Sequence, residues 1–254
     1  MPEHVSRRDF VALVGGVTAA EVIPAVAEAQ SAPKKRSTKA PPKAPAFEPL
    51  ENRPEAYTFF TAPEAAFVEA AVERLIPTDE LGPGAKEAGV AYFIDQQLGG
   101  EFGFAAKMYR QGPWAEGLPT QGYQLPLTPR EVYRLAIAET NAYCKKRYGK
   151  RFDKLSPALQ DTVLQALEEG KLTFESVPGK LFFEMLYANT NQGFFSDPMY
   201  GGNRNKIGWK LIGHPGVPVA YNAFIGRYNV PYRVAEPVGI ADVERKIGLG
   251  GGES

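Results

Sequence analysis

The chain has 254 residues, among them 29 basic and 29 acidic residues, one cysteine and two histidines. The first 46 positions hold seven of the basic and four of the acidic residues, so 22 and 25 remain, which excludes a strongly basic nucleic-acid-binding surface. Beyond position 46 only Cys144 and His214 could supply a thiol or an imidazole. An iron–sulfur cluster, a covalently attached haem, a usual zinc site and an intrachain disulfide are therefore excluded.

The N-terminal segment has the pattern of an export signal. Arg7 and Arg8 stand directly before a weakly apolar run, 10–20, and small residues follow at 25–27, a spacing that a signal peptidase reads. Paired arginines in this position are typical of the twin-arginine route. An ordinary secretory signal is the alternative, and a membrane anchor is disfavoured because the run is shorter than the ~18–20 apolar residues of a span. We expect residues 1–27 to be a signal peptide and the protein to be periplasmic.

The next segment separates this signal from the domain. Residues 28–46 are rich in proline, alanine and lysine and lack apolar periodicity, which is typical of an extended linker. Residues 47–254 are enough for one domain with its own hydrophobic core. They contain no dinucleotide-binding glycine fingerprint and no Gly-x-Ser-x-Gly motif, so we expect no cofactor in this chain and no serine-hydrolase site.

Helix-start motifs and apolar periodicity organise the first half of the domain. Thr61 and Glu64 form a capping-box pattern, and the apolar residues after them fall on one helical face as far as Pro77. After a Gly-Pro-Gly turn, the pattern predicts a second helix over 86–98 and a third, short helix over 101–110.

Three more helices are expected in the second half. Residues 128–148 and 156–169 each begin with Ser or Thr followed by Pro, a strong helix-start signal, and each is followed by glycine. The segment 180–195 is apolar almost all round, which predicts a central helix that is buried on every side.

The segment 196–216 has no helical or strand period and is crowded with glycine. Such a pattern predicts a long, rigid and partly exposed loop around the central helix. Beyond it, 219–225 fits a short helix or strand, and 228–238 fits an extended segment. The elements together predict a mostly α-helical fold: a single, irregular multi-helix domain with a long Gly-rich loop, preceded by a signal peptide and a linker.

Few side chains offer catalytic chemistry. His214 could act as a general base with Asp197 as its orienting carboxylate, and the alternative is a loop histidine that donates to backbone or to a partner. Trp114 and Trp209 could stack against a sugar ring or pack within the loop core. Cys144 falls on a buried helix face and is expected to be an inert thiol.

The Gly-rich loop carries the candidates for contact with a partner protein. Aromatic and arginine side chains are the usual anchors of an interface, and its amides either satisfy the loop backbone or form a recognition surface. The candidate interface residues are Asp197, Tyr200, Asn203, Arg204, Trp209 and His214.

Three blocks of the sequence stand out together. They are LIPTDELGPGAKEAGV at 75–90 with Phe93-Ile94-Asp95, then Gly112-Pro113-Trp114, and GFFSDPMYGGNRNKIGWK at 193–210 with Gly213. In this order and spacing they resemble the gluconate 2-dehydrogenase subunit 3 family, the small subunit of membrane-associated sugar dehydrogenases. The similarity extends from about Thr58 to Tyr228, and the third block is the most specific.

The resemblance implies a complex of three subunits. Its large subunit resembles the glucose-methanol-choline (GMC) oxidoreductases and carries FAD, and a membrane-bound multihaem cytochrome c passes electrons to the respiratory chain. The small subunit holds no redox centre and, in many members, supplies the twin-arginine signal for the large one. No catalytic, cofactor-binding or metal-binding residue is carried over to this chain.

We therefore expect a non-catalytic accessory subunit that supports twin-arginine export, folding and assembly of the FAD-bearing subunit, and that is attached to the membrane peripherally through the complex. Two other interpretations stay open. One is a small periplasmic enzyme that uses Asp197 and His214. The other is a free-standing carbohydrate-binding module that uses Trp114 and Trp209.

Overall fold

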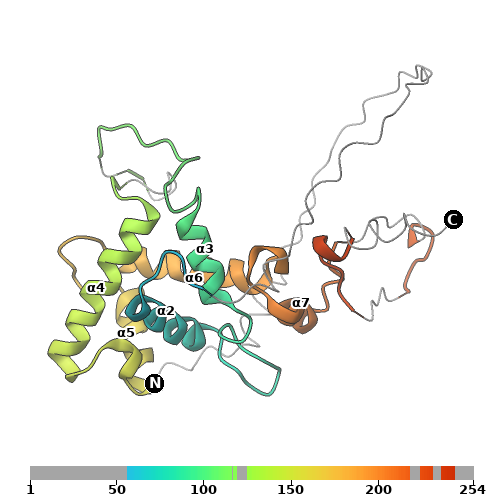
Figure 1. The fold of residues 1–254 in the computed structure, drawn as a ribbon, viewed down its shortest axis with the longest axis horizontal. Coiled ribbons are helices and arrows are strands. Elements are labelled where there is room, and N and C mark those ends of the chain that lie inside the picture. Colours follow the sequence, from blue (N-terminus) through green and yellow to red (C-terminus); the bar gives the residue numbers. More distant parts are fainter. Residues whose placement is uncertain (1–55, 116, 119–124, 218–223, 231–235, 244–254) are drawn as a thin grey trace. The chain divides into compact units, whose positions relative to one another are not determined.

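The computed structural model describes residues 56–115, 117–118, 125–217, 224–230 and 236–243. The expected signal peptide and linker lie outside these residues. In the described part of the chain the elements are helices and turns with isolated β-bridges and no β-strand, which confirms the mostly α-helical fold class (Figure 1). None of the described helices combines the length and the apolar character that a bilayer span requires.

Two helices begin at capping boxes, as the sequence predicts. Helix α2, Ala62–Leu75, follows Thr61, whose backbone N–H and hydroxyl both donate to the Glu64 carboxylate at 2.8 Å. Helix α4, Pro129–Tyr148, follows Thr128, whose side chain pairs in the same way with the residue three positions later. These bonds tie each helix start to the residue that precedes it, so the local sequence determines both starts.

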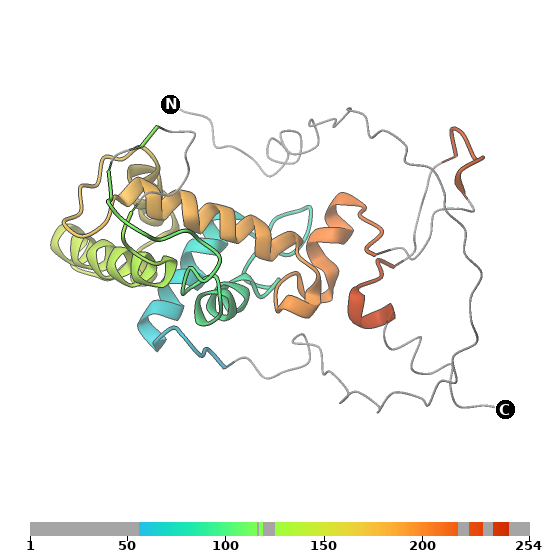
Figure 2. The same cartoon turned by 90° about the horizontal axis from the view of Figure 1, so that it is seen from above.

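Two further helices also lie where the sequence predicts them. Helix α5 spans Pro157–Glu168 and helix α6 spans Gly179–Phe195, and the short 3-10 helix η3, Phe152–Lys154, precedes α5. Helix α6 packs against α2, α3, α4 and α5, and Figure 2 shows it extending along them. It is therefore the central helix of the domain.

The expectation that α6 is buried on every side is wrong. Phe182, Leu186 and Phe194 are fully buried against the neighbouring helices. The opposite side of the helix is exposed at Glu184, Tyr187, Ala188 and Gln192. The neighbours of α6 cover only part of its circumference, so its apolar composition does not translate into burial all round.

Aromatic rings fill the core between α2, α4 and α6. The ring centre of Phe67 lies 4.5 Å from that of Phe152 and 6.2 Å from that of Phe182. Tyr133 meets Phe182 edge to face at 5.4 Å, and its buried hydroxyl accepts from Asn189 Nδ2 at 2.9 Å. Burial raises the pKa of Tyr133, so the hydroxyl stays protonated. Asn189 thus satisfies a polar group of the core.

Two expected helices differ from the structure. Helix α3 spans Val90–Gly99 and not 86–98, because Gly89 adopts a left-handed φ of 73° directly before it. The short helix expected over 101–110 is wrong, since the backbone there forms successive turns with Ala105 at a φ of 55°. A left-handed residue interrupts the regular hydrogen-bond pattern of a right-handed helix.

The Gly-rich segment 196–216 contains more helix than expected. It folds into two 3-10 helices, η4 at Pro198–Tyr200 and η5 at Arg204–Lys206, and a short helix α7 at Ile207–Ile212. Helix α7 packs against α6, so the segment lies against the central helix as predicted, although part of it is helical.

The two segments expected near the C-terminus are described only in part. Within 219–225 the structure describes residues 224 and 225, which belong to a turn closed by a bond from Arg227 N–H to the Phe224 carbonyl oxygen. Within 228–238, Val238 forms an isolated parallel bridge with Gly216.

Candidate partner interface

The segment after α6 turns back tightly on the helix that it follows. Gly208, in α7, lies so close to Phe194 that a Cβ at this position would overlap the Phe194 carbonyl oxygen. Glycine, which has no Cβ, permits this approach. Side chains around α7 consequently contact the end of α6, and several of the expected interface residues bind groups of their own chain.

Asn203 is fully buried and holds this turn together. Its backbone is left-handed, with a φ of 47°, a conformation that asparagine tolerates better than most residues. Its Nδ2 donates to the Ser196 carbonyl oxygen and its Oδ1 accepts from Gly208 N–H, both at 2.8 Å. The amide therefore satisfies the chain's own backbone, one of the two roles that the sequence left open.

Trp209 is a core residue. The residue is only 4% exposed, and its indole Nε1 donates to the Phe195 carbonyl oxygen at 2.8 Å. The His214 ring stacks on the indole, with ring centres 5.1 Å apart. Trp114 lies on a different segment and is 43% exposed. Because Trp209 is buried, the two tryptophans do not form a joint platform for a sugar.

Asp197 and His214 make separate backbone contacts. His214 Nδ1 accepts from Gly216 N–H at 2.7 Å, so the ring accepts from the backbone where we expected it to donate. The Asp197 carboxylate accepts from Met199 N–H at 3.0 Å and from Ile240 N–H at 2.8 Å. Within the described residues the two side chains form no hydrogen bond with each other, so the base and orienting carboxylate of an enzyme are not brought together here.

Tyr200 and Arg204 keep some accessible surface. Tyr200 is 46% exposed. The Arg204 guanidinium lies against Gly89 and 5.7 Å from the centre of the Tyr92 ring, and its backbone N–H donates to the Ala88 carbonyl oxygen at 3.0 Å. Desolvation lowers the pKa of Arg204, and an arginine remains charged at neutral pH. Arg204 thus ties the segment before α7 to the turn before α3.

Contacts with residues nearer the C-terminus also hold the segment around Arg204 and α7 in place. Lys206 Nζ lies 2.5 Å from Asp242 Oδ2, and Val217 N–H donates to the Val238 carbonyl oxygen at 2.7 Å. Asn205 and Lys206 have left-handed backbones, with φ values of 52° and 57°. Such conformations cost free energy in residues other than glycine and persist where surrounding contacts hold them. The ion pair supplies one of these contacts.

Two ionic contacts have structural roles that the sequence did not predict. Asp95 of α3 is fully buried and accepts from the backbone N–H groups of residues 58–60 at 2.7 to 3.0 Å. Arg74 of α2 forms a bidentate pair with Asp161 of α5, at 2.7 and 2.9 Å. In the sequence, the only hint of the role of Asp95 is that a carboxylate follows directly on the apolar run that begins at Val90.

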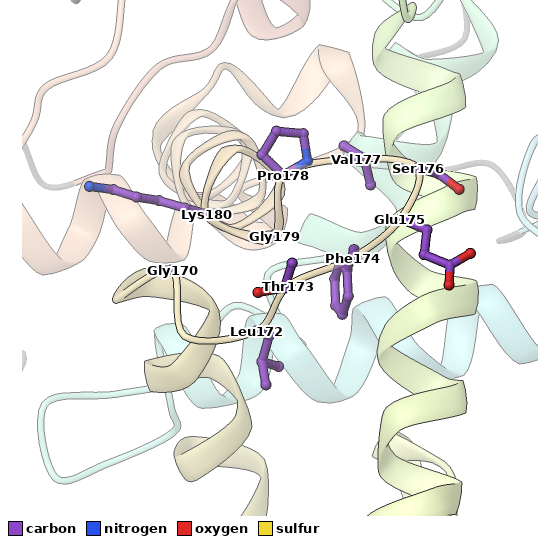
Figure 3. A pocket seen from close by; sticks show the side chains of 10 residues that line it. All are labelled: Gly170, Leu172, Thr173, Phe174, Glu175, Ser176, Val177, Pro178, Gly179 and Lys180. Atoms are coloured by element: carbon purple, nitrogen blue, oxygen red, sulfur yellow. The ribbon is translucent and has the colours of Figure 1, made fainter.

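A surface hollow of about 430 Å³ lies beside the connection from α5 to α6 (Figure 3). Leu172, Phe174 and Val177 give it an apolar lining, and Figure 3 shows Glu175 and Lys180 on opposite sides of the loop. Glu139 of α4 holds this loop in place, because its carboxylate accepts two backbone N–H groups of the loop at 2.8 and 3.0 Å. The hollow offers apolar surface and backbone but no paired acid and base.

Cys144 is buried, as expected, and burial raises the pKa of its thiol to about 11. The thiol is therefore protonated and unreactive at neutral pH. In the described ranges of the chain, no three histidine, cysteine, aspartate or glutamate side chains are placed to hold a metal ion.

Comparison with known proteins identifies the helical core. The family model described as Gluconate 2-dehydrogenase subunit 3 matches residues 62–216, more than half of the 254 residues. The match begins with α2 and includes every helix through α7. No curated protein and no solved structure matches the chain. The chain belongs to the gluconate 2-dehydrogenase subunit 3 family.

Proposed function

We propose that this protein is the non-catalytic small subunit of a flavin-dependent sugar or polyol dehydrogenase complex. In this role it supports the twin-arginine export, the folding and the assembly of the FAD-bearing large subunit. The family match over residues 62–216 carries the proposal, because it names a subunit of a dehydrogenase and includes the whole helical core.

The contacts of the polar side chains support a scaffolding role. Asn203, Asp95 and Asp197 all bind backbone groups of their own chain. The Arg74–Asp161 pair joins two helices. These polar groups hold segments of the chain together. An accessory subunit needs such a rigid framework and a surface for its partner, and it needs no reactive group.

The proposal divides the work of the complex among its subunits. FAD lies in a large subunit of the GMC type, and haem c lies in a membrane-bound multihaem cytochrome c. Electrons pass from the sugar or polyol to the flavin and then through the haems to the respiratory chain. This chain supplies the export signal, through Arg7 and Arg8, and the surface on which the large subunit is assembled. The complex is periplasmic and attached to the membrane through its cytochrome.

Co-purification tests this proposal. With an affinity tag at its C-terminus, the chain is expected to retrieve a flavin-bearing large subunit from cells that produce both proteins, together with sugar-dependent reduction of a dye. The same chain produced alone is expected to be colourless and inactive. Flavin absorption or dehydrogenase activity in the chain alone would contradict the proposal and favour the small-enzyme interpretation. Retention of the chain alone on an immobilised sugar would favour the binding module.

A further inference from the structure

Apolar side chains are exposed over the connection between α3 and α4. Phe104 is 58%, Met108 39%, Tyr109 86% and Trp114 43% exposed. Single exposed apolar residues are normal in soluble proteins, whereas a concentration of them marks a binding surface. These four lie within residues 104–114, and Figure 1 shows this connection at the ends of α3 and α4.

Two arginines lie directly against these rings. The Arg130 guanidinium is 4.1 Å from the centre of the Phe104 ring, and that of Arg110 is 5.6 Å from the Trp114 ring. Arg110 also donates through Nη1 to the Leu127 carbonyl oxygen, at 2.7 Å, and through Nη2 to the carbonyl oxygen of the residue before it, which fastens the connection to the start of α4. A stacked guanidinium keeps N–H donors in its plane for a carboxylate. In the part of the chain that the structure describes, neither arginine forms an ion pair.

The charge of this region is positive although the domain as a whole is not. Lys107, Arg110 and Arg130 outnumber the nearby carboxylates of Glu101 and Glu131. Glu101 pairs with Lys107 at 2.7 Å, and Glu131 is bound by the residue that caps α4 and is further stabilised by the charges of the two arginines. The N-terminus of α4 adds partial positive charge. By contrast, the chain beyond position 46 has 22 basic and 25 acidic residues.

We infer that this region is the docking surface for the large flavoprotein subunit. The connection face, as we name it, consists of Phe104, Met108, Tyr109, Arg110, Trp114 and Arg130. Aromatic residues, methionine and arginine are the types enriched in protein interfaces. Charge complementarity requires that the large subunit present carboxylates among apolar side chains here, where they pair with the two arginines. The inference rests on the proposed function for the identity of the partner.

Tyr109 is the best probe of the connection face. It is 86% exposed, and its hydroxyl makes one hydrogen bond, at 3.3 Å, to a residue two positions away. Leu81, in the turn between α2 and α3, is a single exposed apolar residue, 40% exposed, and serves as the control. The full chain and the large subunit are purified separately, and the affinity between them is measured. Tyr109→Ala is expected to weaken binding about thirtyfold, as is typical of an interface anchor, and Leu81→Ala to leave it unchanged.

Charge reversal provides a second, independent measurement. Arg110→Glu is expected to weaken binding at least as much as Tyr109→Ala, because it places a carboxylate against those of the partner. Arg110→Lys keeps the positive charge and is expected to retain more of the affinity. Thermal unfolding of each isolated variant shows that the fold is intact. For Tyr109→Ala the melting temperature should stay unchanged, since the side chain packs on little of the domain.

The outcomes separate the inference from the proposed function. A native chain that does not bind the flavoprotein contradicts the proposed function, and the inference fails with it. A native chain that binds, with Tyr109→Ala and Arg110→Glu binding equally well, overturns the connection face alone. The flavoprotein is the wrong occupant if Tyr109→Ala instead abolishes binding of the cytochrome subunit, or self-association of this chain, and leaves flavoprotein binding intact.

Discussion

Glu73 is unusual among the polar side chains of this domain because its carboxylate is poorly satisfied. Its Oε2 is buried without a hydrogen-bond partner, and its Oε1 accepts from Thr78 N–H at a long 3.3 Å. Desolvation, aided by the charge of Glu87, raises the pKa of Glu73. By contrast, Asp95 accepts three backbone N–H groups at 3.0 Å or less. The two carboxylates therefore affect stability in opposite directions at neutral pH.

The raised pKa of Glu73 predicts a dependence of stability on pH. A carboxyl group whose pKa rises on folding favours the folded state below its unfolded pKa, and that contribution is lost as the pH rises through the folded pKa. Glu73→Gln is therefore expected to raise the melting temperature at pH 7, by about 1–3 °C because partial exposure screens the charge. The gain should shrink towards pH 4. Glu80→Gln, an exposed neighbour, is the control.

Calorimetric scans of the native chain and of both variants between pH 4 and pH 8 measure this effect. An equal change in melting temperature for Glu73→Gln and Glu80→Gln would show that the burial of Glu73 has no energetic consequence. A difference between Glu73→Gln and the native chain that grows towards low pH would contradict the sign of the pKa shift.

Elements of the domain are joined by a small number of buried or half-buried polar contacts in addition to the aromatic core. Asp95 fixes the segment 58–60, just before α2, onto α3. Arg74 and Asp161 join α2 to α5. Asp95 belongs to one of the sequence blocks that indicate the family, and the structure gives it a purely architectural contact. Its role is to satisfy backbone N–H groups that the chain buries as it enters α2.

Removal of the Asp95 carboxylate tests this role. In Asp95→Ala three backbone N–H groups lose their acceptor, at roughly 1 kcal/mol or more each, so the free energy of unfolding should fall by about 3 kcal/mol or more. Asp95→Asn keeps one acceptor oxygen and is expected to lie between this variant and the native chain. Urea unfolding followed by circular dichroism measures both. An Asp95→Ala variant as stable as the native chain would show that these hydrogen bonds contribute little.

The whole molecule combines an export-signal pattern, a linker pattern and a family core. The proposed function connects them, because a large subunit that folds around FAD before export can cross the membrane on the signal of its small subunit. The connection face would then hold the two subunits together during export. Under this proposal, export and docking are separable steps, one dependent on Arg7 and Arg8 and the other on the connection face.

Substitution of the paired arginines tests the export step. Arg7→Lys with Arg8→Lys keeps the charge, and we expect it to leave both this chain and the flavoprotein in the cytoplasm because the twin-arginine route reads arginines. Cell fractionation and an assay of dehydrogenase activity measure the loss from the periplasm. Lys34→Arg with Lys35→Arg, in the linker, is a control of equal charge. Normal periplasmic activity of the flavoprotein in the first variant would mean that it is exported independently.

The sequence by itself determined the features that depend on neighbours along the chain. Helices α2, α4 and α5 each begin at a Ser or Thr and have a proline in the first turn, and their starts agree with the structure to the residue. The family blocks were likewise readable as sequence. The burial of Cys144 followed from helical periodicity, since its face of α4 is mostly apolar. The signals for the helix starts and for the burial of Cys144 act within a few residues of one another.

Only the tertiary structure decided which residues far apart in the sequence contact each other. The late start of α3 at Val90 involves Gly89, which lies against Arg204, more than a hundred positions away. Asn203 and Trp209 were both candidates for the partner interface, yet their side chains bind backbone groups around α6. The connection face has similar residue types and remains exposed. Residue type determines what a side chain can bind, whereas contacts between segments far apart in the chain determine whether it is still available.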